Sequence, residues 1–210
     1  MSNLILVRHG ISEWNALGLW TGWNDVSLTE EGKKEARNAA EAIRDIHIDV
    51  AFTSDLIRAQ QTYAEIKKAL NLESIPEIRA TEIKERNYGD LAGKNKWKVK
   101  EEYGEEQFMK WRRSWDYPIP NGESLKDVYA RVIPYYTEHI KPYLTAGKNV
   151  LITAHGNSIR ALVKYLENIP DDEISQLEIG TGEVYRYSMN EKGEVISKEI
   201  RSSNPQTGKV

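Results

Sequence analysis

The sequence predicts an α/β three-layer sandwich, in which a mostly parallel central sheet carries helices on both faces. Short apolar runs at residues 4–7, 50–53 and 150–154 are typical of buried strands, and a segment with helical spacing follows each of them. Such alternation favours parallel strands, with ligands outside their carboxyl ends. The 210 residues suffice for a substantial core, and we expect one domain over residues 1–210.

Composition excludes several classes of protein. The chain is 40% hydrophobic and 29% charged, as in soluble globular proteins. It has no Cys, which excludes disulfides, zinc–thiolate sites and iron–sulfur clusters. The net charge of −3 weighs against a nucleic-acid surface. No signal peptide and no apolar run of membrane-spanning length is found, so we expect a cytoplasmic protein without a membrane partner.

The first strand ends in Arg8-His9-Gly10, and Ser12 then caps a helix. Gly10 permits a tight turn or a close approach to a ligand, and free N–H groups at the helix start beside Arg8 favour an anion. Cationic surroundings disfavour the imidazolium and keep His9 neutral, with a nitrogen lone pair available beside a bound phosphate. We therefore predict that His9 is a nucleophile that attacks phosphorus.

Two helices are predicted next from their start signals. The helix from Thr29 carries apolar residues at the spacing of a buried stripe, and most of them are small, which implies close packing on the sheet. After the second strand, Ser54-Asp55 offers an N-cap to a helix that runs to about residue 70. Arg58 lies in its first turn, where a cation opposes the helix dipole, so we interpret Arg58 as a ligand contact. A further short strand is expected around residues 75–78.

Two segments without clear periodicity are candidates for ligand contacts. Thr21-Gly22, in a loop over residues 19–25, either offers backbone N–H groups to a ligand or only turns the chain. Residues 81–122 contain several Trp and many basic residues, and we expect them to form an excursion that covers a site. Within it, Arg112-Arg113 stands beside aromatic residues and is not explained by a solvated face.

Residues 149–158 repeat the order of residues 4–12, in which a strand, His-Gly and the start of a helix follow one another. A helix from Ser124, kinked or split at Pro134, precedes a strand that ends in His155-Gly156 before another apolar-periodic helix. Because both histidines follow strands of one parallel sheet, their imidazoles can converge. Residues 183–200 are expected to form a strand or hairpin at the sheet edge, followed by a polar tail from about residue 201.

The sequence gives less support to a metal site or to a serine nucleophile. Neither His9 nor His155 stands in a His-x-x-x-His or His-x-His spacing, and no carboxylate cluster accompanies them, so we expect no metal site. No Gly-x-Ser-x-Gly elbow is present, which argues against a serine nucleophile.

Seven motifs in one order span nearly the whole chain and together resemble the cofactor-dependent phosphoglycerate mutases of the histidine phosphatase superfamily. They are Arg8-His9-Gly10, Thr21-Gly22-Trp23, Arg58, Glu85-Arg86-Asn87-Tyr88-Gly89, Trp111-Arg112-Arg113-Ser114, Gly122-Glu123-Ser124-Leu125 and Ala154-His155-Gly156-Asn157-Ser158. The first motif indicates only the superfamily. The fourth and fifth are much more specific to the mutases.

The resemblance implies a role for each matching residue. His9 is the histidine that becomes phosphorylated, His155 flanks the transferring phosphoryl group, and Glu85 is the general acid and base. Phosphate-binding positions match Arg8, Asn15 and Arg58, and Ser12 and Asn157 are expected nearby as further substrate contacts. Groups that hold the carboxylate and distal phosphate of the substrate match Thr21, Gly22, Tyr88, Lys96, Arg112, Arg113 and Gly156.

The implied activity is the interconversion of 3-phosphoglycerate and 2-phosphoglycerate in glycolysis and gluconeogenesis, primed by 2,3-bisphosphoglycerate and without a metal. Without a metal, imidazoles and the planar forks of arginines must supply positioning and charge. A phosphatase of small phosphate monoesters would share Arg8-His9-Gly10 but would not require the fourth and fifth motifs. A non-catalytic module that binds a phosphorylated ligand would not need two histidines and Glu85.

The chain departs from the family pattern at a few positions. Ile11 stands where the family usually has Glu, Trp20 replaces Phe, and Lys94 replaces Leu. None of these changes removes a catalytic atom, although Ile11 alters the charge beside the site. The insertion that many members carry before Gly122 is missing, so we expect a homodimer or a monomer and a looser cover with more hydrolysis.

Overall fold

The computed structural model describes residues 1–202, and residues 203–210 of the expected polar tail lie outside this part. A six-stranded sheet forms the middle layer, in the order β3-β2-β4-β1-β5-β6. Its strands are β1 (Ser2–Arg8), β2 (Val50–Ser54), β3 (Glu77–Ala80), β4 (Val150–Ala154), β5 (Val184–Met189) and β6 (Val195–Ser202). The first four strands pair in parallel, and the β5–β6 hairpin is antiparallel at one edge. The mostly parallel sheet and the edge hairpin are confirmed, while residues 201 and 202 complete β6 rather than begin a tail.

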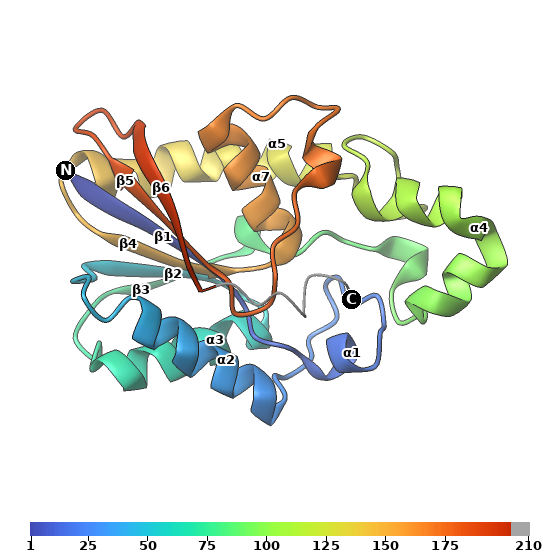
Figure 1. The fold of residues 1–210 in the computed structure, drawn as a ribbon, viewed down its shortest axis with the longest axis horizontal. Helices are drawn as coiled ribbons and strands as arrows, with labels where there is room; N and C mark the ends of the chain where they lie inside the picture. The colour runs from blue at the N-terminus through green and yellow to red at the C-terminus, as the bar shows by residue number, and fades with distance from the viewer. Residues whose placement is uncertain (203–210) are drawn as a thin grey trace.

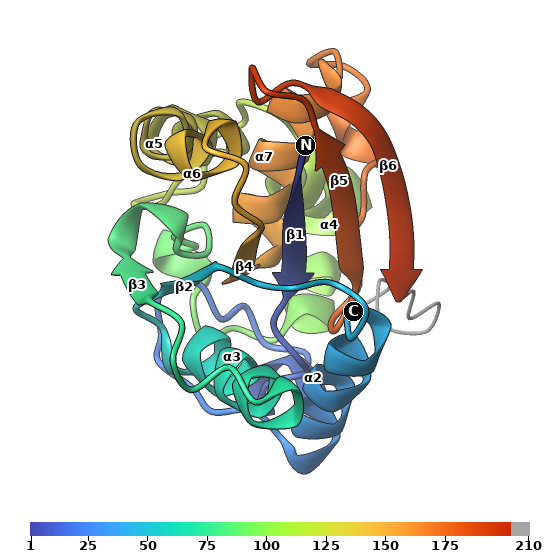
Figure 2. The same cartoon turned by 90° about the vertical axis from the view of Figure 1, so that its left-hand side faces the viewer.

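Helices cover both faces of the sheet, which gives the predicted three layers (Figures 1 and 2). On one face lie α2 (Glu30–Ala42) and α3 (Ile57–Leu70), and on the other lie α5 (Leu125–Tyr135), α6 (Lys141–Thr145) and α7 (Gly156–Glu167). The short elements are α1 (Glu13–Ala16), η1 (Thr81–Ile83), η2 (Gly89–Leu91), η4 (Ile174–Gln176) and the π-helix η3 (Tyr136–Ile140). Within residues 1–202, no helix has both the length and the apolar composition that crossing a bilayer requires.

Strand β1 shows why the opening run is continuously apolar. Leu4 and Leu6 belong to the core that α5 and α7 cover, whereas Ile5 and Val7 belong to the core under α2 and α3. All four side chains are fully buried. A strand that is buried on both faces needs apolar residues at every position, not at alternate ones.

Gly10 is required by packing. A Cβ atom at this position would lie 2.1 Å from the carbonyl oxygen of Gly32 in α2, and its φ is not in the left-handed region. The two glycines therefore let the loop after β1 press against the backbone of α2. We predicted that Gly10 permits a tight turn or a close approach to a ligand, whereas it permits a close approach to a helix.

Three local predictions need correction. Helix α3 begins at Ile57 with Leu56 as its N-cap, and Ser54 instead completes β2 and accepts the Leu56 N–H at 3.2 Å. Strand β3 lies about two residues later than expected. Pro134 lies inside α5 without splitting it, because the helical path continues through η3 into α6.

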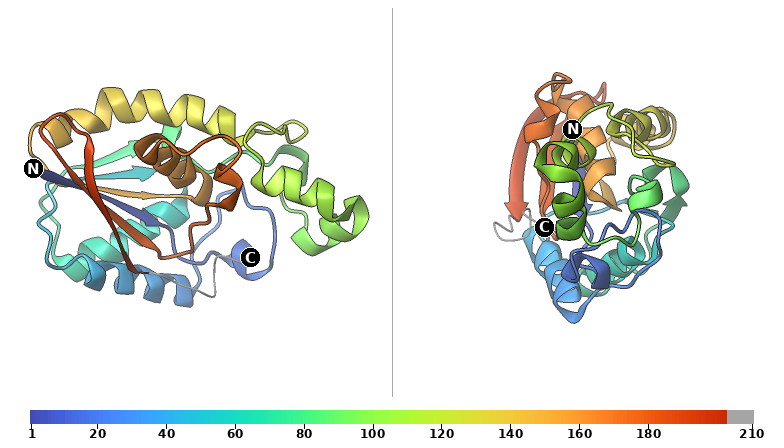
Figure 3. Two further views of the ribbon diagram at one scale, coloured as in Figure 1. Left: turned by 45° about the horizontal axis from the view of Figure 1, so that its top comes forward. Right: turned by 90° about the vertical axis from the view of Figure 1, so that its right-hand side faces the viewer.

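The excursion over residues 81–122 is more regular than its sequence suggests. It contains α4 (Lys96–Arg113), which extends beyond one end of the sheet (Figure 3). Gly104, with φ 82° and ψ 161°, interrupts the helical path and so breaks the apolar spacing that would have revealed it. Trp20, Phe108 and Trp111 join a separate small core beneath this helix.

Candidate active site

His9 lies directly after β1, and its neighbour fixes the ring. Nδ1 lies 2.7 Å from the carbonyl oxygen of Gly10; because a carbonyl only accepts, Nδ1 carries the proton and Nε2 keeps its lone pair. The Nε–H of Arg58 approaches Nε2 at 3.4 Å. Burial lowers the pKa of His9 well below its ordinary value, and the charges of Arg58 and Arg8 lower it further. His9 is therefore neutral at neutral pH.

His155 follows the neighbouring strand β4 and immediately precedes α7. The centroids of the His9 and His155 rings are 5.0 Å apart, with 59° between the ring planes. Nε2 of His155 lies 2.6 Å from Oγ of Ser54, and its backbone N–H donates to Oγ of Ser158 at 3.1 Å. Burial lowers the pKa of His155 well below its ordinary value, as does the charge of Arg58. The two imidazoles meet as the parallel strands require.

Arg58 lies in the first turn of α3, as predicted, and is only 1% exposed. Its guanidinium donates to the carbonyl oxygens of Gly22 at 2.7 Å and Asn24 at 3.0 Å. These bonds hold the loop that contains Thr21, whose buried hydroxyl has no hydrogen-bond partner among residues 1–202. Burial lowers the pKa of Arg58 to about 10, so the side chain stays charged at neutral pH.

Glu85 is buried beside the first turn of α7, the helix that His155 caps. Its Oε1 accepts the backbone N–H groups of Arg86 at 2.7 Å and Asn157 at 3.1 Å, and the Asn157 amide at 2.9 Å. Burial alone would raise the pKa of Glu85, but these hydrogen bonds and the charges of Arg8 and Arg58 lower it below its ordinary value. The carboxylate is therefore ionised at neutral pH.

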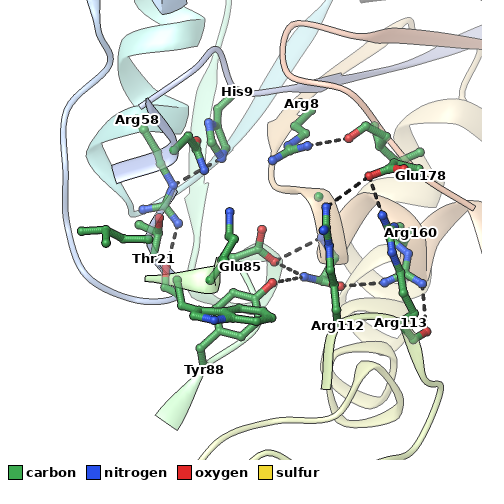
Figure 4. Close-up of a pocket in the computed structure, with 18 residues that line it drawn as sticks. Arg8, His9, Thr21, Arg58, Glu85, Tyr88, Arg112, Arg113, Arg160 and Glu178 are labelled. Atoms are coloured by element: carbon green, nitrogen blue, oxygen red, sulfur yellow. Dashed lines mark hydrogen bonds and ion pairs between the residues drawn. The ribbon is translucent and has the colours of Figure 1, made fainter. Parts of the chain in front are cut away.

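His9, Arg58 and Glu85 line one pocket at the carboxyl ends of the parallel strands (Figure 4). The lining contains six cationic side chains, namely those of Arg8, Arg58, Lys96, Arg112, Arg113 and Arg160, against the carboxylates of Glu85 and Glu178. The excess of positive charge is local, because the whole chain has a net charge of −3. Burial, together with the charges of Arg8 and Arg112, lowers the pKa of Lys96 to about 8. Such a pocket suits a small, multiply charged anion.

Nearly all the predicted site residues line this pocket: Arg8, His9, Asn15, Thr21, Gly22, Arg58, Glu85, Tyr88, Lys96, Arg112, Arg113, Gly156 and Asn157. Of the predicted set, which lies wholly within residues 1–202, only Ser12 and His155 are not part of the lining. The hydroxyl of Ser12 caps α1 and donates to Oδ1 of Asn15 at 2.8 Å, so it orients a lining residue. His155 lies fully buried against His9. No cluster of three or more His, Cys, Asp or Glu side chains that could hold a metal ion occurs in residues 1–202.

Comparison with known proteins assigns the chain to a family. The family model of the histidine phosphatase superfamily (branch 1) matches residues 4–200. The chain belongs to the histidine phosphatase superfamily. It is 48% identical over 199 residues to a 2,3-bisphosphoglycerate-dependent phosphoglycerate mutase of Mesorhizobium japonicum, which covers 94% of this chain and 97% of the relative. A phosphoglycerate mutase of Schizosaccharomyces pombe is 46% identical, with 94% of each chain covered. The predicted resemblance to the mutases is confirmed.

Solved structures share the fold of this member of the histidine phosphatase superfamily. A mycobacterial glucosyl-3-phosphoglycerate phosphatase in complex with VO3 has a TM-score of 0.83 at 24% identity, over 97% of this chain and 99% of that one. The α-ribazole phosphatase of Shigella flexneri has a TM-score of 0.79 at 25% identity, over 95% and 96% of the two chains. At such low identity the likeness concerns the fold alone, and it confirms the predicted α/β architecture.

Two charged groups that line the pocket, Arg160 and Glu178, were not predicted. Arg160 in α7 donates to Oδ1 of Asn157 at 3.0 Å and to the carbonyl oxygen of Ile174 at 2.9 Å. Burial lowers the pKa of Arg160 to about 9. A charged residue three positions after Asn157 in an apolar helix was a usable signal. Glu178 lies on a connecting segment and had no local signal in the sequence.

Proposed function

We propose that the chain interconverts 3-phosphoglycerate and 2-phosphoglycerate through a phosphohistidine at His9, in glycolysis and gluconeogenesis. The observation that carries the proposal is the pair of neutral imidazoles, 5.0 Å apart, beside a pocket lined by six cations. Relatives with 45–48% identity over 94% of the chain bear the mutase name, which supports the same activity here.

His9 is the nucleophile in this proposal. Its Nε2 lone pair forms the bond to phosphorus while the bond between phosphorus and the substrate oxygen breaks, and the Gly10 carbonyl holds the proton at Nδ1 throughout. Arg8 and Arg58, the cations that lower the pKa of His9, offset the charge of the phosphoryl oxygens. Neutral His155 lies on the other side of the transferring group.

Glu85 moves the proton. Its ionised carboxylate takes the proton of the substrate hydroxyl as that oxygen attacks the phosphohistidine, and returns it to the other oxygen when the second transfer releases that oxygen. Because Oε1 already accepts three N–H groups, we assign the proton to Oε2, which lies 3.7 Å from the position of a Cβ at Gly156.

The residues of the pocket fit 2,3-bisphosphoglycerate as a priming donor. This compound supplies the phosphoryl group that first loads His9. Two buried groups of the lining, Nε of Arg8 and the hydroxyl of Thr21, lack a hydrogen-bond partner among the described residues and suit phosphate oxygens. Asn15, Arg58 and Asn157 complete the phosphate contacts. Tyr88, Lys96, Arg112, Arg113 and the backbones of Gly22 and Gly156 hold the carboxylate and distal phosphate.

Labelling tests the assignment of the nucleophile. Incubation with radioactive 2,3-bisphosphoglycerate should leave one acid-labile phosphate on His9, and the variant His9→Ala should take up none while keeping the circular dichroism of the parent. Label on a serine, or on the variant, would reject the mechanism. A coupled assay for 2-phosphoglycerate should depend on added 2,3-bisphosphoglycerate and should survive a chelator, since the proposal assigns no role to a metal.

Several expectations from the sequence remain proposals. The single domain with a cover over residues 81–122, the cytoplasmic location and a homodimeric or monomeric state belong to this group. Hydrolysis of the phosphohistidine is the competing reaction if the cover admits water.

A further inference from the structure

One carboxylate of the anion pocket has no part in the proposed chemistry. Glu178 follows η4, and its Oε1 lies 2.5 Å from a guanidinium nitrogen of Arg113 and 3.6 Å from one of Arg112 (Figure 4). The side chain of Glu178 is 36% exposed, compared with 17% and 15% for the two arginines. An anion of the protein itself therefore already offsets part of the positive charge of the pocket, at its more exposed side.

The contacts of Glu178 differ from those of a structural ion pair, for which Arg131 and Glu123 of the same chain provide an example. Arg131 holds Glu123 through both carboxylate oxygens, at 2.8 Å and 2.9 Å, and also donates to backbone carbonyls of the segment that carries Glu85. Glu178 instead meets both arginines with a single oxygen, and its separation from Arg112 exceeds a hydrogen bond. A partly exposed contact made through one oxygen is easily exchanged for another anion.

Both arginines have supports that do not involve Glu178. The guanidinium of Arg112 lies over the ring of Phe108, 5.8 Å from its centroid, and the Arg112 carbonyl faces Arg86 at 3.4 Å. The carbonyl of Arg113 accepts a hydrogen bond from Arg160 at 3.3 Å. The end of α4 therefore stays in place when Glu178 is neutral or displaced.

We propose that Glu178 is a specificity-determining residue: a displaceable internal counter-ion that lowers the affinity of the pocket for anions in proportion to their charge. The inference rests on the proposed function for its consequence. A monophosphoglycerate carries about three negative charges at neutral pH and 2,3-bisphosphoglycerate about five. Glu178 therefore weakens the binding of the bisphosphorylated ligand more than that of the monophosphorylated one. This difference favours release or reorientation of 2,3-bisphosphoglycerate between the two transfers.

The test compares Glu178→Gln with Glu173→Gln. Glu173 lies just before η4, is exposed and does not line the pocket, so its variant changes the net charge by the same amount. Calorimetric titration uses inorganic phosphate and tripolyphosphate, neither of which requires turnover. A unit charge about 8 Å from a ligand changes affinity by about twofold per ligand charge after partial screening. Glu178→Gln should therefore tighten the binding of phosphate about threefold and that of tripolyphosphate, which carries about four negative charges, about fifteenfold, and Glu173→Gln should alter both affinities less than about 1.5-fold.

Two outcomes would overturn the inference. If Glu178→Gln weakens both anions, Glu178 is a brace that orients the arginines. If it raises the affinity for both anions by the same factor, or if Glu173→Gln has the same effect, the charge of Glu178 does not select among ligands. The proposed mutase activity is tested separately. If the chain binds anions in this charge-dependent way but forms no 2-phosphoglycerate, the role of Glu178 is supported and the proposed substrate is rejected.

Discussion

Replacement of Glu85 by Gln separates proton transfer from structure. The glutamine carbonyl oxygen can accept the three N–H bonds that Oε1 accepts from Arg86 and Asn157, so the backbone around the site keeps its partners. The lost functions are the basicity of the carboxylate and its attraction to Arg8 and Arg58. Removal of a general base costs about 10²- to 10⁴-fold in rate. We therefore expect kcat to fall about 10³-fold while the free energy of unfolding changes by about 1 kcal/mol or less.

The assay follows 2-phosphoglycerate formation at saturating 3-phosphoglycerate and 2,3-bisphosphoglycerate. KM for 3-phosphoglycerate should not rise, because the proton is transferred only in the transition state and the loss of a negative charge from the pocket favours an anionic substrate. Glu82→Gln is the matched control, since Glu82 lies three residues away on η1 and outside the pocket lining. Its kcat should stay within about twofold.

A different result would refute the reasoning about Glu85. If Glu85→Gln unfolds at the parental urea concentration and keeps more than about a tenth of the parental kcat, another group carries the proton. A rise in KM with unchanged kcat would make Glu85 a substrate-positioning group, because such a change reports lost ground-state binding.

Two further predictions concern stability. His9 stays neutral in the folded chain because burial and then Arg58 lower its pKa, whereas the unfolded chain takes up a proton below about pH 6.5. Stability should therefore fall as the pH drops through this value, and urea unfolding at pH 7.5 and 5.5 should show about 1 kcal/mol less loss for His9→Asn than for the parent. Gly10→Ala forces a Cβ to within 2.1 Å of the Gly32 carbonyl and should destabilise the fold by about 3 kcal/mol. At Gly156 the nearest atoms to a Cβ, those of Arg8, are 3.5 Å away, so Gly156→Ala should unfold like the parent. Equal pH slopes for parent and His9→Asn, or equal unfolding midpoints for the two alanine variants, would contradict these expectations.

The predictable parts of the site are those whose signal comes from residues that are adjacent in the sequence. An apolar strand followed by His-Gly and a helix start fixes the place of His9 and of His155, because the strand ends and the helix begins within a few residues. Arg58 was predictable for the same reason, since an unfavourable cation in the first turn of a helix needs an explanation. Each of these signals depends on neighbours along the chain.

The parts that were missed depend on contacts between distant segments. Glu178 meets arginines 65 and 66 residues away, and nothing in its own neighbourhood indicates an anion pocket. Ser54 has the composition of an N-cap, but its contact with the His155 ring spans 101 residues. Helix α4 was not recognised because its charged residues and the break at Gly104 obscure the apolar spacing.

The register of the sheet explains why the two imidazoles are the right distance apart. Strands β1 and β4 are parallel neighbours in which Arg8 is paired with Ala154, so His9 and His155 are the next pair beyond the ladder. The His9 N–H still donates to the Ala154 carbonyl at 2.9 Å. Adjacent strands lie about 4.8 Å apart, and the ring centroids are separated by 5.0 Å. A slip of one residue would turn one imidazole to the opposite face of the sheet. The buried apolar residues of β1 and β4 hold that register, so these core positions also fix the geometry of the nucleophile.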